Sequence, residues 1–169
     1  EKPIAIRSSS LLEDSHYQPF AGIYNTYMVP YLKEDLNRMF KMVMDSIKAV
    51  YASAFYKDSK AYMQATSNVI DEEKMAIVIQ EVVGNLYDDK FYPHFSGVAQ
   101  SYNFYPIAHM KPEEGFANIA IGLGKYVVDG EKSYRFSPKY PELENYSTKD
   151  LFKNSQTNFY AVNMKEREL

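Results

Sequence analysis

The sequence of 169 residues has no cysteine and no tryptophan. The lack of cysteine excludes disulfides, thiolate nucleophiles and cysteine-ligated zinc, and it suits a reducing compartment. Long hydrophobic runs are absent too, because the longest apolar stretches, Met75–Val83 and Ala117–Val128, fall short of the roughly 18 residues of a membrane span. Charge of one sign is not in excess, with 19 Lys and Arg against 22 Asp and Glu. We therefore expect a cytoplasmic chain that binds neither nucleic acid nor membrane.

The composition is that of a globular protein. Hydrophobic residues make up 46% and charged residues 24% of the chain, which excludes a disordered or fibrous sequence. The first residue is Glu1, and the apolar segment Pro3–Ile6 follows at once without a signal-peptide pattern. We expect one domain that forms part of a longer protein.

Apolar spacing predicts an α+β chain. Ile4–Ile6 reads as a short strand that ends in a polar turn, with Arg7 at its end. From Leu36 to Tyr51 apolar residues recur every three or four positions, which predicts one long amphipathic helix, capped by Asp35 and continuing less regularly to Ser67–Asn68. Met75–Val83 is β-branched and nearly continuous, as in a central strand covered on both faces.

The second half of the chain is harder to interpret. Phe95–Tyr105 predicts a strand broken at Ser96–Gly97, and Asn118–Ile121 predicts a shorter one. Gly122-Leu123-Gly124 then indicates a tight strand-to-helix connection. Residues 131–169 are polar and rich in Tyr and Pro, and we expect an extended arm or linker there.

Two segments have the chemistry of a phosphate site. Arg7 and the three serines after it supply a bidentate guanidinium and hydroxyl donors, although an isolated arginine at a strand end is more often a surface charge or an ion-pair partner. Gly22 allows close approach of a backbone to a ligand, and Thr26 adds a hydroxyl four residues later, although an ordinary turn explains the segment equally well.

Other familiar motifs are not met. The glycines at 122, 124 and 130 fit neither the dinucleotide fingerprint nor the Walker motif. His16, His94 and His109 lack the spacing of a helical metal site. The acidic pairs at 13–14, 72–73 and 113–114 read as solvated surface, and the sequence has no Gly-x-Ser-x-Gly elbow.

Several of these segments resemble, in one order, a known family. Ile4–Ser10, Glu13-Asp14, Phe20-Ala21-Gly22 and Thr26 are similar to the opening signature of the ATP-binding domain of phosphoenolpyruvate synthase and pyruvate phosphate dikinase. The further similar blocks are Ile47–Phe55, with Tyr51 where a Trp is usual, Ile77–Val83, Ser96–Val98 and Gly122–Gly130. The resemblance spans Pro3 to about Gly130, so that we expect residues 1–130 to form part of the nucleotide-binding domain.

The resemblance implies an ATP-grasp-like lobe, with a mixed or antiparallel sheet packed on one long amphipathic helix. It implies that Arg7 binds the ATP phosphates, that Gly22 and Thr26 line the phosphate-side loop, and that Gln80 lies in the nucleotide pocket. In this family ATP, with Mg²⁺, phosphorylates a histidine on a swivelling domain, and a further domain passes the phosphate to pyruvate. The implied partners are ATP and those phosphohistidine and pyruvate/phosphoenolpyruvate domains of the same polypeptide.

The chain also departs from the family pattern. The family's lysine lies upstream of the Arg-Ser-Ser block, and its metal-binding Glu and Gln with a following Arg have no counterpart after Gly130. A Gly-Gly pair followed by His is absent, and Gln100-Ser101 replaces the usual Phe-Thr. We therefore assign no catalytic residue and no metal ligand, and we expect the chain by itself to be inactive within a phosphotransferase parent.

Two alternatives to this function remain. A degenerate ATP-grasp-like domain could serve as a structural or regulatory module without catalysis, since folds outlive their chemistry. A related phosphotransferase could instead use a polysaccharide or a drug as the acceptor. A truncated lobe also exposes apolar surface, which favours self-association.

Overall fold

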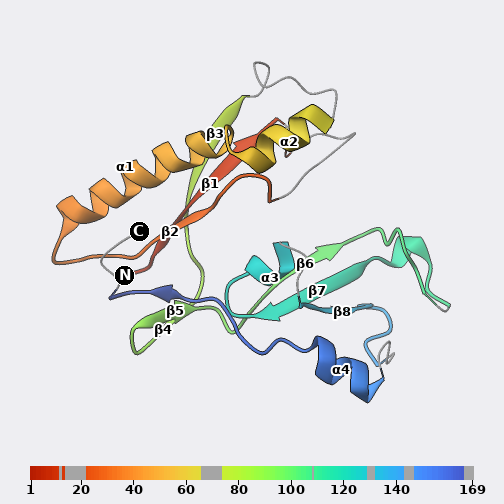
Figure 1. The fold of residues 1–169 in the computed structure, drawn as a ribbon. Helices are drawn as coiled ribbons and strands as arrows, with labels where there is room; N and C mark the ends of the chain where they lie inside the picture. The colour runs from red at the N-terminus through yellow and green to blue at the C-terminus, as the bar shows by residue number, and fades with distance from the viewer. Residues whose placement is uncertain are drawn as a thin grey trace. The chain divides into compact units, whose positions relative to one another are not determined.

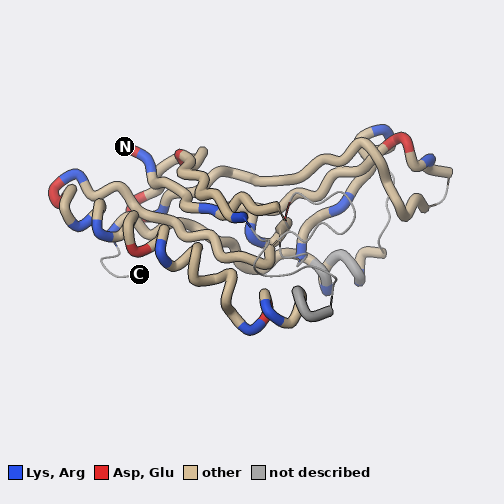
Figure 2. The backbone as a smooth tube through the Cα atoms, turned by 90° about the horizontal axis from the view of Figure 1, so that it is seen from above, with Lys and Arg blue, Asp and Glu red and all other residues tan. Residues whose placement is uncertain are grey.

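A computed structural model describes residues 1–11, 13, 22–65, 74–107, 109–128, 132–142 and 147–165. The chain is α+β and divides into two compact units (Figure 1). Unit 1 comprises residues 1–91 and 162–169, and unit 2 comprises residues 92–161. None of the helices in the described ranges has both the length and the apolar character needed to cross a membrane. Figure 2 shows that acidic and basic residues both occur along the described backbone.

The main sheet of unit 1 has three antiparallel strands. Strand β1 (Ile4–Ser10) lies between β2 (Tyr27–Val29) and β3 (Met75–Glu81). The expectation that Arg7 ends the first strand is wrong, because pairing with β3 extends β1 through the serines to Ser10. The expectation that Met75–Val83 is a central, doubly covered strand is also wrong. β3 is an edge strand whose Val78 and Ile79 are 41% and 53% exposed.

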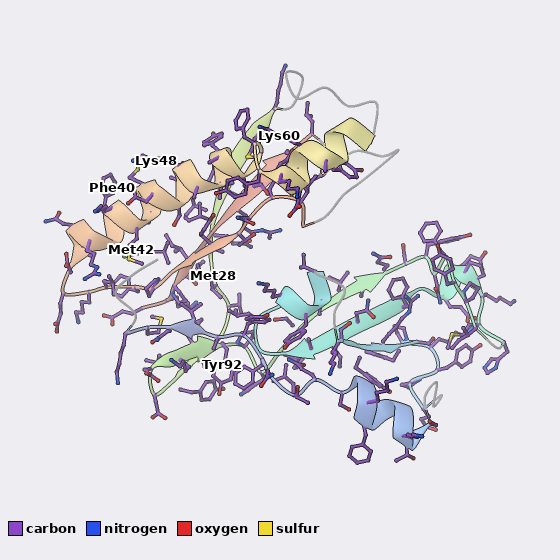
Figure 3. All side chains as sticks on the ribbon, in the orientation of Figure 1. Met28, Phe40, Met42, Lys48, Lys60 and Tyr92 are labelled. Carbon is purple, nitrogen blue, oxygen red and sulfur yellow. The ribbon has the colours of Figure 1, made fainter. Side chains whose placement is uncertain are left out.

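One helix covers this sheet. Helix α1 (Leu36–Ser53) begins at Asp35, whose carboxylate accepts a hydrogen bond from the Arg38 backbone N–H at 3.0 Å, so the predicted cap is confirmed. The inner face of α1 packs on the strands around a buried cluster (Ile6, Val29, Met42 and Val50). Figure 3 shows Met42 on the sheet side of α1 and Phe40 on the opposite side.

The predicted single helix is two helices. The backbone N–H groups of Phe55 and Tyr56 donate to carbonyls three residues back, which tightens the chain, and α2 (Lys57–Ala65) then begins. The Ser59 hydroxyl stabilises this break by donating to the Ser53 carbonyl at 2.7 Å. The predicted stop at Ser67–Asn68 lies outside the described residues.

A second small sheet completes unit 1. Strands β4 (Asn85–Tyr87) and β5 (Lys90–Tyr92) form a hairpin, and β9 (Val162–Asn163) pairs with β5. Asp88 in the turn has a φ of 54°, a conformation that Asp adopts more readily than most residues. The C-terminal part of the chain therefore returns to unit 1.

Unit 2 is built on a three-stranded antiparallel sheet. Its order is β6 (Phe95–Gln100), β7 (Phe116–Ile121) and β8 (Tyr134–Phe136). The short helices are η2 (Pro112–Glu114), α3 (Lys125–Val128) and α4 (Thr148–Asn154). The predicted break at Ser96–Gly97 is wrong, because β6 pairs with β7 through both residues.

The segment 131–169, for which the sequence predicts an extended arm or linker, contains regular structure. It includes β8, α4 and β9, and two of these elements pair with strands from the preceding part of the chain. The local Tyr and Pro content suggested an arm, because it carries no signal of pairing with strands that are distant in the sequence. The domain boundary at residue 130 stays a prediction.

Candidate functional site

The face of the unit 1 sheet opposite α1 holds two of the four predicted site residues. Ile6 faces α1 in the buried cluster, and side chains alternate along a strand, so Arg7 projects from the opposite face. Arg7 pairs with Val78, and Gln80 pairs with Ala5, so these side chains share one face. The sheet therefore brings together two residues that lie 73 positions apart in the sequence.

Arg7 and Gln80 are within hydrogen-bonding reach of each other. The Arg7 Nη1 atom lies 3.5 Å from Gln80 Oε1, and both residues are exposed. In the described part of the chain Arg7 has no carboxylate partner. A guanidinium has five N–H donors, so this arginine retains both its charge and donors for an anionic ligand. The neutral amide of Gln80 contacts the guanidinium without neutralising its charge.

Thr26 lies one residue before β2, just beyond the register defined by the pairing of Ile6 with Tyr27. Tyr27 pairs with Ile6, so one step further along the same antiparallel register brings Thr26 opposite Arg7. Thr26 is exposed and immediately precedes β2. The sheet itself brings together only the Arg7 guanidinium and the Gln80 amide, and Thr26 lies at the start of the neighbouring strand.

Gly22 lies in the turn region before β2. Its φ of 84° belongs to the left-handed region, which glycine adopts without the strain that a Cβ would cause. Among the described residues, no hydrogen bond joins Gly22 or Thr26 to Arg7 or Gln80. Phe20 and Ala21, which belong to the same predicted segment, lie outside the described residues.

The glycine-rich segment of unit 2 is a strand-to-helix connection, as predicted. β7 ends at Ile121 and α3 begins at Lys125. Gly122 has a φ of 77°, its carbonyl accepts from the Ser96 hydroxyl at 2.7 Å, and the Leu123 N–H donates to the Tyr160 carbonyl at 2.9 Å. These contacts give the turn a structural role.

The remaining titratable groups form no metal centre where the structure describes them. In the ranges given above, no group of three or more His, Asp or Glu side chains could hold a metal ion. His16 and the pair at 72–73 lie outside those ranges. Glu13 accepts from the Ser8 hydroxyl at 3.0 Å, and Glu114 binds Lys139, so both acids have structural partners. We therefore assign no metal ligand among the described residues.

One arrangement was missed by the sequence. Asn103, Arg135 and Ser137 line a cavity in unit 2, although Asn103 and Arg135 are 32 positions apart. No spacing rule links such residues, since the pairing of β7 with β8 and the packing of the 103–110 segment bring them together. The polar character of Asn103 and Ser137 within otherwise apolar or aromatic surroundings was the only signal in the sequence.

Comparison with known proteins identifies the family. The chain matches the pyruvate phosphate dikinase AMP/ATP-binding domain over residues 1–168. It is also 31% identical over 129 residues to an uncharacterized phosphotransferase, YvkC, of Bacillus subtilis (strain 168). That match covers 76% of this chain and 13% of the relative. Because the family match spans nearly the whole chain, the protein belongs to the family of pyruvate phosphate dikinase AMP/ATP-binding domains.

Proposed function

We propose that this chain is the nucleotide-binding part of a phosphotransferase similar to phosphoenolpyruvate synthase and pyruvate phosphate dikinase. The observation that carries the proposal is the contact of Arg7 Nη1 with Gln80 Oε1, 3.5 Å apart on the sheet face opposite α1, within a family of AMP/ATP-binding domains. An ATP-grasp-like lobe in unit 1 is the fold that accompanies this function.

Each proposed site residue has a distinct role. Arg7 binds phosphate oxygens, because a planar guanidinium donates two parallel hydrogen bonds and supplies a full positive charge. Thr26 and Gly22 line the phosphate side of the site, with a hydroxyl and an accessible backbone. Gln80 contacts the nucleotide and holds the Arg7 guanidinium.

The proposed reaction transfers a phosphoryl group from ATP to a histidine on a separate carrier domain. Charge accumulates on the transferring group and on the leaving oxygens, and a fixed guanidinium stabilises that charge. Mg²⁺ would accompany the nucleotide and neutralise phosphate charge in the parent enzyme. The described residues supply no cluster for it, so its ligands would come from elsewhere.

An Arg7→Ala substitution in the complete protein tests this role. We expect ATP-dependent phosphorylation of the carrier histidine to fall by about tenfold or more, since a charge-assisted hydrogen bond contributes about 1.5–3 kcal/mol. Arg38→Ala is the matched control, because Arg38 is a half-buried arginine on α1, away from the proposed site residues. Unchanged phosphorylation in a folded Arg7→Ala protein would contradict the role of Arg7 in phosphate binding and favour a structural module.

A further inference from the structure

Unit 2 contains a cavity of about 180 Å³ between its sheet and the segment that joins β6 to β7. Three polar residues, Asn103, Arg135 and Ser137, line it. Its apolar lining comes from Tyr105, Ile107, Met110, Phe116 and Phe136. The cavity combines a large apolar wall with a few polar groups, which is the composition of small-molecule sites.

The Arg135 guanidinium is held from two sides. Its Nη2 donates to Asn103 Oδ1 at 2.8 Å, and its central carbon lies 3.8 Å from the centre of the Phe116 ring. Asn103 is itself fixed, because it is only 3% exposed and its Oδ1 also accepts from the Tyr105 backbone N–H at 3.1 Å. The guanidinium plane is therefore set before any ligand arrives.

The charge of Arg135 has no protein counter-ion where the structure describes the chain. Its hydrogen-bond partner, the Asn103 amide, is neutral, and Phe116 provides only a cation–π contact. A partly buried cation gains free energy from a paired anion that also uses its remaining N–H donors.

Ser137 offers a second polar group at the same cavity. The residue is 2% exposed, and its hydroxyl oxygen has no hydrogen-bond partner within the described ranges. Leaving a buried polar group unpaired costs about 1–3 kcal/mol, so native structures satisfy most such groups.

We propose that this cavity binds a small monocarboxylate with an aromatic or branched apolar body. A cavity of about 150 Å³ is known to hold benzene, so 180 Å³ suits one ring or a branched chain with one acid group. The carboxylate pairs with Arg135, and the body contacts the apolar wall. A single guanidinium in the lining balances one negative charge, which favours a carboxylate over a doubly charged phosphate.

This cavity is lined by other residues than those of the proposed nucleotide site. All of its lining residues belong to unit 2, whereas Arg7 and Gln80 belong to unit 1. Failure of ATP binding would leave this proposal standing, and the converse also holds.

The test is an NMR titration of the chain with benzoate and, separately, with benzyl alcohol. Benzoate is expected to shift the amide signals of Asn103, Phe116 and Arg135, and to bind about tenfold or more tightly than the neutral alcohol. Arg135→Gln is expected to remove that preference. Arg38→Gln, which changes an arginine of unit 1 outside the cavity lining, should keep it.

A second variant keeps the test decisive if Arg135→Gln does not fold. Ile107→Trp fills the cavity from a position that is 48% exposed, and it should weaken both probes together. Two results would overturn the proposal: no shifts from benzoate in the folded chain, or equal binding of benzoate and benzyl alcohol.

Discussion

Gly97 lies in the middle of β6, where it faces the neighbouring strand at close range. A Cβ at this position would lie 2.6 Å from the Asn118 carbonyl oxygen and 3.0 Å from an Ile119 methyl. The nearest atom belongs to backbone that is itself paired in the sheet, so it cannot move without disturbing β7. This glycine is required for the close approach of two strands.

Gly97→Ala is therefore expected to lower the free energy of unfolding by about 1–3 kcal/mol, as overpacking does. Gly124→Ala is the matched control, because its Cβ would meet Ser96 at an ordinary 3.4 Å. Urea denaturation of both variants measures the difference. Equal stabilities for the two variants would contradict the close approach.

The carboxylate of Glu114 is tied to a lysine from across unit 2. Lys139 Nζ lies 2.6 Å from Glu114 Oε1, and the Lys111 backbone N–H donates to Oε2 at 3.0 Å. The hydrogen bond from Lys139, and then that from Lys111, lowers the pKa of Glu114 below its ordinary value of 4.5. A lowered pKa in the folded state stabilises the fold above the ordinary pKa, and this stabilisation is lost as the pH falls through the lowered one.

Glu114→Gln should accordingly lower the melting temperature at about pH 7, and this difference should shrink as the pH falls through the lowered pKa of the native carboxyl. Glu113→Gln removes the same charge from an exposed neighbour and should leave the pH dependence of melting unchanged. Thermal melts at several pH values, from neutral to acidic, measure these differences in melting temperature. A Glu114 variant whose pH profile matches that of the native chain would refute the ion pair's role.

Helix α1 docks on the sheet through an apolar face that is more buried than its outer face. Met42 is 7% exposed and belongs to the cluster that packs on the sheet, whereas Met44 is 38% exposed. Met42→Ala should cost about 2–5 kcal/mol of stability, and Met44→Ala should cost well below that. Chemical denaturation of this pair compares identical substitutions two residues apart. Similar losses for both would mean that α1 does not dock on the sheet through the Met42 face.

The start of α1 could be predicted from the sequence, and the end could not. Asp35 and the apolar steps after it are local signals, and the helix begins where they indicate. The break after Ser53 depends on a hydroxyl contact from Ser59, and it interrupts an apolar pattern that continues through Phe55. Met75–Glu81 likewise has the composition of a buried strand, but its place at the sheet edge follows from pairing with β1.

The candidate nucleotide site could be anticipated only in part. The resemblance singled out Arg7 and Gln80, and the antiparallel register of β1 and β3 explains how they meet. No motif in the sequence predicted the Arg135 cavity, because its side chains come from a loop and two strands that meet only in the folded structure. Local sequence thus indicates which residues carry chemistry, and strand pairing decides which of them act together.

At the scale of the whole molecule, two units divide the proposed chemistry. Unit 1 carries Arg7 and Gln80, and unit 2 carries the cavity around Arg135. The match covers 13% of the phosphotransferase YvkC, and the proposed carrier histidine and acceptor domains would lie outside the residues of this chain. Nucleotide binding is the step that this chain's own residues would supply.

The central claim is tested most directly by calorimetric titration of the complete protein with magnesium-ATP, alongside its Arg7→Ala and Arg38→Ala variants. The account predicts saturable binding to the native protein and to Arg38→Ala, with an affinity about tenfold or more weaker for Arg7→Ala. Native-like ATP affinity in the folded Arg7→Ala protein, or no binding by the folded native protein, would contradict it.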